Sequence, residues 1–180
     1  DFLTILEDFS FMPGGRITSN AGTGLKGTTY INCFVDGFTG ESQDSMEGIL
    51  DTLRRQALIL KSEGGYGFNS DVMRPKGAYI GGIGNESPGS VEMLDMWDTQ
   101  SAVITKGSGK KSKKGKQKIR KGAQMVTKSV WHPDIEEYIT VKQTENKLTK
   151  FNMSILCDDD FMNAVKHNKP WNLKFPDFEN

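Results

Sequence analysis

Hydrophobic and polar positions alternate along the chain in a way that predicts strands and helices in turn. Residues 28–35 (TTYINCFV) are rich in β-branched and aromatic side chains and follow a glycine-bearing segment, which indicates a strand entered from a loop. Apolar residues then recur at helical spacing over 43–61, with charged residues between them. The glycines of 64–67 are predicted to close that helix and to lead into a short strand near 68–73.

The same pattern repeats in the rest of the chain. A glycine-rich loop over 77–89 precedes a helical pattern over 90–105, and strands are predicted at 123–130 and 150–156. A proline and acidic residues from position 133 are typical of the first turn of a helix, and a last helix is predicted at 158–167. Strand and helix thus alternate four times, which predicts a parallel α/β sheet or barrel with its chemistry in the loops.

Composition adds little to this picture except in one segment. The chain has 180 residues, with 36% hydrophobic and 26% charged residues, as expected of one ordinary globular unit. Its 23 basic and 23 acidic residues cancel, but nine of the basic ones lie within 106–121, so the remainder is acidic. A local anion site fits this distribution better than a surface that coats nucleic acid.

Targeting signals and metal sites are not predicted. No apolar run approaches the roughly 20 residues that span a bilayer, and the first residues lack the pattern of a signal peptide, so we expect no membrane association and a cytoplasmic protein. Cys33 and Cys157 are far apart, and His132 and His167 have no zinc-like spacing. In a reducing compartment, a disulfide at either cysteine would be catalytic rather than structural.

Nine short segments occur in the order in which ribonucleotide reductase large subunits carry them. They are Pro13-Gly14-Gly15-Arg16, Asn20-Ala21-Gly22-Thr23, Asn32-Cys33-Phe34, Asp44-Ser45-Met46, Gly64-Gly65-Tyr66-Gly67, Arg74-Pro75-Lys76-Gly77-Ala78, Arg120-Lys121-Gly122-Ala123, His132-Pro133-Asp134-Ile135-Glu136-Glu137 and Phe151-Asn152-Met153-Ser154. Each segment alone is weak evidence, but together they cover nearly the whole chain. The sequence therefore resembles this family, and most of all its adenosylcobalamin-dependent class II branch.

The resemblance implies a fold and a reaction. It implies about half of a ten-stranded α/β barrel, with residues 1–180 as its amino-terminal part, a basic loop insertion at 106–121 and the carboxyl-terminal half absent. The implied reaction is the reduction of ribonucleotides to deoxyribonucleotides by thiyl-radical chemistry. Its products are the precursors for DNA replication. Cys33 matches the first of two cysteines that deliver electrons and close into a disulfide. We expect its thiol to project from a parallel strand into a cavity beside the edge that binds the triphosphate. Without the surrounding motifs, Cys33 would be read as a small buried hydrophobe.

The resemblance also assigns an allosteric effector, either a deoxynucleoside triphosphate or ATP. Asp44 matches the residue that holds the effector ribose, and Arg74 matches a cation that meets its phosphates, as a guanidinium fork can do. Read without the resemblance, Asp44 would be an acid at a helix N-terminus and Arg74 a solvated charge. The loop that contains Gly81 and Gly82 corresponds to the first specificity loop, where glycines let the backbone approach a triphosphate. Otherwise this loop is an ordinary connection.

Residues for the ribonucleotide substrate are implied in two places. Gly15 and Arg16 lie where the family binds substrate phosphate partly through backbone, and Asn32 stands next to the redox cysteine. The basic stretch corresponds to the second specificity loop, where Arg120 matches the arginine over the substrate base and Gly122 lies where the backbone comes close. The lysines of the insertion themselves are expected to be solvated charges.

Three further expectations concern single residues and missing parts. His132 is expected to be a capping or packing residue, and Cys157 a buried thiol. The family's radical cysteine lies in an Asn-x-Cys-x-Glu motif that does not occur here, and the partner of Cys33 is also absent. We therefore expect the chain to be inactive without its carboxyl-terminal half.

The implied partners lie outside the chain. They are adenosylcobalamin as the radical source, with a diiron-radical subunit as the alternative, a thioredoxin-like or glutaredoxin-like reductant, and a second copy in a homodimer. Two other functions stay open at this point. One is a nucleic-acid-binding module that uses the basic stretch, and the other is a nucleotide sensor without catalysis.

Overall fold

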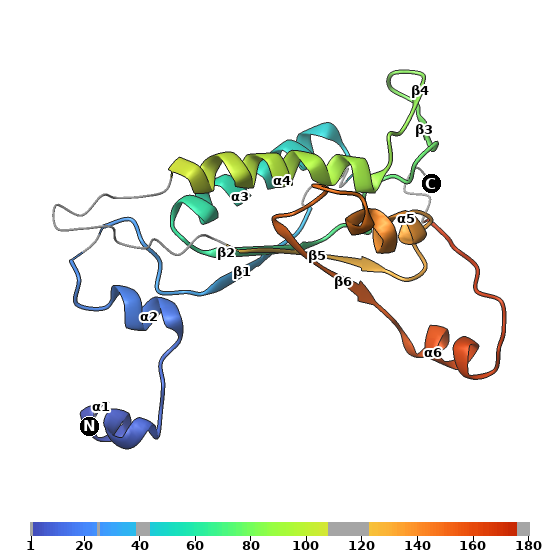
Figure 1. Ribbon diagram of the computed structural model, residues 1–180. Coiled ribbons are helices and arrows are strands. Elements are labelled where there is room, and N and C mark those ends of the chain that lie inside the picture. The colour runs from blue at the N-terminus through green and yellow to red at the C-terminus, as the bar shows by residue number, and fades with distance from the viewer. Residues whose placement is uncertain (1, 25, 39–43, 108–122, 176–180) are drawn as a thin grey trace.

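The computed structural model describes residues 2–24, 26–38, 44–107 and 123–175 (Figure 1). Two short helices and a 3-10 turn come first: α1 (Phe2–Leu6), η1 (Glu7–Phe9) and α2 (Gly15–Asn20). The predicted alternation then follows as β1 (Cys33–Asp36), α3 (Met46–Lys61), β2 (Gly65–Asn69), α4 (Ser90–Gly107), β5 (Gln124–Ser129), α5 (Ile135–Thr140), β6 (Phe151–Leu156) and α6 (Asp159–Lys166). A small hairpin of β3 (Tyr79–Ile80) and β4 (Asn85–Glu86) precedes α4, and η2 (Val141–Gln143) follows α5.

The four main strands form one parallel sheet in the order β1-β2-β5-β6. This arrangement confirms the predicted parallel α/β class. In Figure 1, α3 and α4 lie side by side along one face of the sheet. The core lies between these helices and the sheet, where the rings of Phe68 and Trp97 are 5.2 Å apart and those of Phe68 and Phe151 are 6.1 Å apart.

The two faces of the sheet differ sharply in exposure. Side chains that point toward the helices are buried, as Phe68 at 3% and Val126 at 0% exposure show. Their neighbours along the strands point to the other face, where Val35 is 94% and Met125 is 41% exposed. Since side chains alternate along a strand, much of one face of the sheet is left uncovered by the described residues, although Ser129 on that face is buried.

Several boundaries differ from the predicted ones. The first strand begins at Cys33 rather than at Thr28, because the Thr29 N–H donates to the carbonyl of Ser62 and its carbonyl accepts from the Asn20 side chain. The second strand begins at Gly65, so the glycines assigned to the end of the helix belong partly to the sheet. The short helices α1 and α2 and the β3–β4 hairpin were not predicted.

The start of α3 corrects one reading of Asp44. The helix begins at Met46, and the Ser45 hydroxyl oxygen caps it by accepting a hydrogen bond from the Gly48 N–H at 3.0 Å. Asp44 therefore precedes the cap and is not an acid of the first helical turn.

Candidate functional site

Cys33 lies at the amino end of β1 and is exposed on the uncovered face of the sheet. Its partner in the neighbouring strand is Gly65, and a Cβ atom placed on Gly65 would lie only 3.0 Å from the Cys33 Sγ. The absence of a side chain at position 65 therefore makes room for the thiol. The alternative in which Cys33 is a small buried hydrophobe is wrong.

Asn32 joins β1 to the start of α2. Its side-chain oxygen accepts a hydrogen bond from the Arg16 backbone N–H at 3.0 Å, and its carbonyl accepts from the Gly65 N–H at 2.8 Å. A Cβ on Gly14 would stand 2.5 Å from the Asn32 side-chain nitrogen, so a side chain at position 14 would displace the Asn32 amide. The predicted substrate residues Gly15, Arg16 and Asn32 thus lie at the same end of the sheet as the thiol.

The Arg16 side chain is already engaged within the chain. It is buried, and its guanidinium forms an ion pair with Glu63 at 3.2 Å, just after α3. Together with the bond from its backbone to Asn32, this pair ties α2 to the amino end of the sheet. The described geometry gives Arg16 a role in holding the segment in place.

Asp44 and Arg74 form a second group. The Arg74 Nε donates to one carboxylate oxygen of Asp44 at 2.6 Å, and the Arg74 backbone N–H donates to the other at 3.0 Å. A second guanidinium nitrogen donates to the carbonyl of Tyr79 at 2.7 Å, at the start of the hairpin. Both side chains keep part of their surface exposed, at 11% for Asp44 and 25% for Arg74.

Gly81 and Gly82 are exposed in the turn of the β3–β4 hairpin, which projects from the sheet in Figure 1. A Cβ on Gly82 would meet nothing within 4 Å, and a Cβ on Gly81 only the Tyr79 ring at 3.9 Å. Neither residue has a positive φ. Packing within the described residues thus gives no reason for glycine at these two positions.

The two groups lie at opposite ends of the sheet. Cys33 and Gly65 begin their strands, whereas Arg74 follows the carboxyl end of β2. Asp44 lies at that same end because it forms the ion pair with Arg74. Because all four strands are parallel, these ends are separated by the length of the strands. The expectation that the thiol projects beside the triphosphate-binding edge is therefore wrong for Asp44 and Arg74.

A family model described as "Ribonucleotide reductase, barrel domain" matches residues 31–180. This chain belongs to that family.

Named relatives agree with this assignment. A vitamin B12-dependent ribonucleoside-diphosphate reductase of Thermoplasma acidophilum is 35% identical over 168 residues, which cover 93% of this chain and 20% of the relative. The large subunit of the Trypanosoma brucei brucei ribonucleoside-diphosphate reductase is 30% identical over 186 residues, covering 98% of this chain and 20% of that subunit. The chain thus spans about a fifth of the length of these relatives.

One solved structure shares the fold. The class Id ribonucleotide reductase alpha subunit of Actinobacillus ureae superposes with a TM-score of 0.66 at 22% identity, over 87% of this chain and 25% of that one. At this identity the likeness supports the arrangement of strands and helices alone.

Two buried basic residues, His132 and Lys128, lie at the carboxyl end of this reductase barrel sheet, and the sequence analysis did not single out Lys128. His132 is fully buried; its Nε2 lies 3.0 Å from the Met73 carbonyl, and its Nδ1 accepts from the Asp134 N–H, which confirms the packing and capping role. Lys128 is also fully buried, and its ammonium donates to the Ser70 carbonyl. Burial lowers the pKa of Lys128 to about 8, against the attraction of Asp71 and Asp134. The sequence did hold a signal for Lys128: it lies two residues after Val126, on the side of the alternating strand that faces the core.

Burial also governs the protonation of His132. Desolvation and the nearby Lys128 lower its pKa, although the bond to Met73 opposes this. A neutral ring fits the geometry, because Nδ1 must lack a proton to accept from Asp134 while Nε2 donates to the carbonyl.

The remaining predicted residues give two results. Arg120 and Gly122 lie outside the described residues. Cys157 is exposed after the end of β6, so the expectation of a buried thiol is wrong. The residue follows the last ladder position of an edge strand, where nothing in the described residues packs over it.

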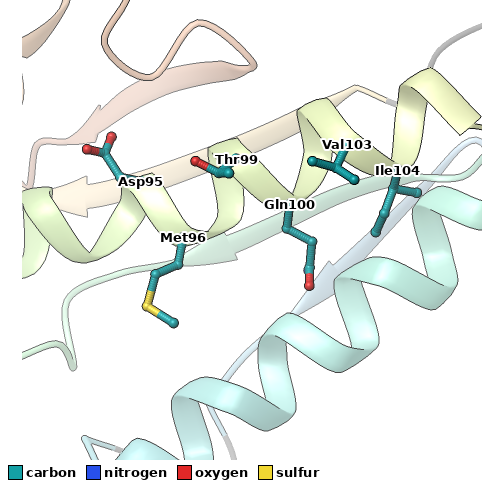
Figure 2. A pocket seen from close by; sticks show the side chains of 6 residues that line it. All are labelled: Asp95, Met96, Thr99, Gln100, Val103 and Ile104. Atoms are coloured by element: carbon teal, nitrogen blue, oxygen red, sulfur yellow. The ribbon is translucent and has the colours of Figure 1, made fainter.

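An apolar groove runs along α4 away from all these residues. Figure 2 shows the side chains that line it, with Gln100 and Ile104 pointing toward α3. The lining residues are Asp95, Met96, Thr99, Gln100, Val103 and Ile104. Gln100 is held in place by hydrogen bonds to the Leu53 carbonyl and the Gln56 side chain.

None of the described helices combines the length and apolar character needed to cross a bilayer.

Proposed function

We propose that this chain is the part of a ribonucleotide reductase barrel that supplies one redox thiol and the specificity-effector site. The observation that carries the proposal is Cys33, which is exposed on the open face of a parallel sheet beside a glycine that leaves it room. In the intact barrel this face is proposed to line the interior, with the further strands completing the ten-stranded closure. The exposed face suits the lining of a barrel interior, since apolar side chains on it, such as Val35, have no second layer packed against them in the described residues.

The proposed reaction uses two thiols as the source of its two electrons. The ribose C2′–OH bond breaks and the oxygen leaves as water, a C2′–H bond forms, and the two electrons come from Cys33 and a second cysteine, which become a disulfide. A cysteine thiyl radical on the part of the protein beyond this chain activates the substrate. A thioredoxin-like or glutaredoxin-like dithiol then reduces the disulfide.

The test of this proposal is Cys33→Ser in the intact protein. We expect loss of turnover and loss of the disulfide that peptide mapping finds after one turnover in the absence of reductant. Cys157→Ser is the matched control, because this thiol is also exposed but lies at the other end of an edge strand. Wild-type turnover in Cys33→Ser would refute the assignment.

The substrate is proposed to lie at the amino end of the sheet. Gly15 and Asn32 stand there with Cys33, and Arg16 holds their segment through Glu63. Arg120 and Gly122 precede β5, whose first residue, Gln124, belongs to this end. Their proposed contacts with the substrate base rest on the family resemblance.

The effector is proposed to bind at the carboxyl end. Arg74 presents a guanidinium that is fixed by Asp44 and the Tyr79 carbonyl, and Gly81 and Gly82 leave the hairpin tip open to a triphosphate. A prepositioned guanidinium loses little entropy when it binds phosphate. Asp44 retains an exposed edge, which suits a hydrogen bond from a ribose hydroxyl.

The radical source is proposed as adenosylcobalamin, because the Thermoplasma acidophilum relative is a vitamin B12-dependent enzyme. A diiron-radical subunit is the alternative. Within the described residues no group of three or more His, Cys, Asp or Glu side chains is arranged to hold a metal ion.

The groove along α4 is proposed to contact a second copy in a homodimer. If a two-fold axis passes near Thr99, the helix meets its own copy in antiparallel orientation. The acidic first turn with Glu92 then lies opposite Lys106 of the other copy, while Met96 and Val103 cover each other's apolar surface.

A further inference from the structure

The connection between β2, which ends at Asn69, and α4, which begins at Ser90, contains the loop that is proposed to bind the effector. Within this connection, residues 76–90 form a loop whose two ends lie against each other. A Cβ on Gly89 would lie 2.8 Å from the Lys76 Cβ, so the two ends of the loop touch. Gly89 also has a φ of +98°, a conformation that a side chain would strain. The shape of the loop therefore depends on what holds these two ends together.

A single carboxylate holds both ends. One oxygen of Asp134 accepts from the Lys76 backbone N–H at 3.0 Å, and the other accepts from the Ser90 N–H at 2.8 Å and the Ser90 hydroxyl at 2.6 Å. Asp134 is only 7% exposed. Burial works against its ionised form, but the hydrogen bonds from Ser90 and Lys76 outweigh it and lower the pKa of Asp134. The carboxylate is thus ionised and fully used within the protein.

His132 adds a third attachment from the same turn. Its imidazole bonds the carbonyl of Met73, directly before Arg74, while its other ring nitrogen accepts from the Asp134 N–H. Arg74 consequently lies between two attached residues, Met73 and Lys76. The turn of residues 132–134 comes from the carboxyl end of β5, so it holds the loop from a neighbouring strand.

We propose that Asp134 is a positioning residue for the effector site: it closes the mouth of the 76–90 loop and thereby presents the Arg74 guanidinium to a nucleoside triphosphate. The inference rests on the proposed effector function of Arg74. Asp134 acts through the backbone of Lys76 and Ser90 and does not itself contact the effector. Asp134 links the turn after β5 to both ends of the 76–90 loop, and we call this link the staple.

The decisive variant is Asp134→Asn in the intact protein. The amide keeps one acceptor oxygen but turns an N–H donor toward the donors at one end of the loop, so that end is released. We expect the dissociation constant for dTTP, measured by calorimetry, to rise about tenfold. Turnover at saturating dTTP should recover, so the change falls on the half-saturating dTTP concentration rather than on maximal rate.

Asp98→Asn is the matched control. Asp98 also accepts a hydrogen bond from a backbone N–H, that of Lys150 at 2.7 Å, but it lies outside the loop. Its dTTP affinity should equal that of the wild type. Hydrogen exchange should quicken at Lys76 and Ser90 in Asp134→Asn and stay unchanged there in Asp98→Asn, which a general loss of stability would not produce.

Two further variants keep the inference testable if Asp134→Asn does not fold. Ser90→Ala removes one of the three hydrogen bonds and should weaken dTTP binding by about twofold to threefold. Gly89→Ala forces the loop ends apart from the other side and should weaken it by about tenfold. Wild-type affinity in a folded Asp134→Asn, or in both of these variants, overturns the inference.

Arg74→Ala separates this inference from the proposed function. If Arg74→Ala weakens dTTP binding and the loop variants do not, only the staple is wrong. If Arg74→Ala binds dTTP like the wild type, the effector assignment fails, and the staple fails with it.

Discussion

Cys33 and Gly65 stand side by side on neighbouring parallel strands, and a Cβ at position 65 would come within 3.0 Å of the thiol sulfur. The same Cβ would lie 3.1 Å from the Asn32 carbonyl, which is backbone and cannot move away easily. The glycine is thus part of the environment of the proposed redox thiol.

Gly65→Ala is expected to displace the thiol and reduce kcat/KM about tenfold, since a shift worth roughly 1.4 kcal/mol in the transition state has this effect. Steady-state kinetics of the intact protein measure it, together with the rate at which an aromatic disulfide reagent modifies Cys33. Gly67→Ala is the control, because its Cβ would have its nearest neighbour at 3.6 Å, an ordinary contact. Equal activity in both variants would contradict the prediction.

Arg74→Lys is expected to raise the dissociation constant for dTTP about tenfold, because an ammonium cannot hold Asp44, the Tyr79 carbonyl and a phosphate in one planar array. Arg54→Lys is the matched control, an exposed arginine that pairs with Asp51 on α3. Calorimetry with dTTP compares the two. A lysine that binds as well as arginine would show that only charge is needed at position 74.

The buried Lys128 predicts a distinctive dependence of stability on pH. Its pKa is about 8 in the folded protein and 10.5 ordinarily, so below pH 8 both states carry the proton and the full cost of burying the charge is present. Between pH 8 and 10.5 the unfolded state binds more protons, and stability rises with pH. The change is on the order of 3 kcal/mol over the whole window.

Lys128→Met should remove this rise. The midpoint of thermal unfolding of the variant minus that of the wild type should fall between pH 8 and 9.5, whatever its value below pH 8. Lys166→Met serves as an exposed control. The range stops there because burial raises the pKa of Tyr66 and Tyr138, which makes folding less favourable above about pH 10. A constant difference would mean that Lys128 titrates alike in both states.

Val103→Glu is expected to weaken the proposed homodimer by about tenfold or more, because it buries an unpaired charge against the second copy. Sedimentation of the intact protein over a range of concentrations measures the dimer constant. Val165→Glu on α6, where the valine is also exposed, is the control. Unchanged association in Val103→Glu would place the dimer contact elsewhere.

Local patterns along the chain were sufficient for the class of fold. The apolar spacing within 43–61 and 90–105 predicted α3 and α4, and the strands predicted at 123–130 and 150–156 match β5 and β6 nearly to the residue. These signals are local, since helix and strand periods arise within one element. Closure of the sheet into a ten-stranded barrel remains a prediction.

Contacts between distant segments escaped the sequence. The glycines of 64–67 were predicted to close the helix. Gly65 instead begins β2, where a Cβ would lie 3.0 Å from the Cys33 sulfur on the neighbouring strand. Asp44 and Arg74 matched two separate motifs, yet their shared ion pair shows only in the folded chain. Cys157 was expected inside and lies outside, because burial depends on what covers an edge strand.

The amino-acid sequence by itself determined the order of strands and helices and the family, because these follow from short periods and from motifs read in order. Tertiary structure alone decided that Cys33 and the Asp44–Arg74 ion pair occupy opposite ends of one sheet, and that Asp134 joins the two ends of the 76–90 loop. Such relations depend on which strands become neighbours and in which register, and that is a property of the whole packed chain.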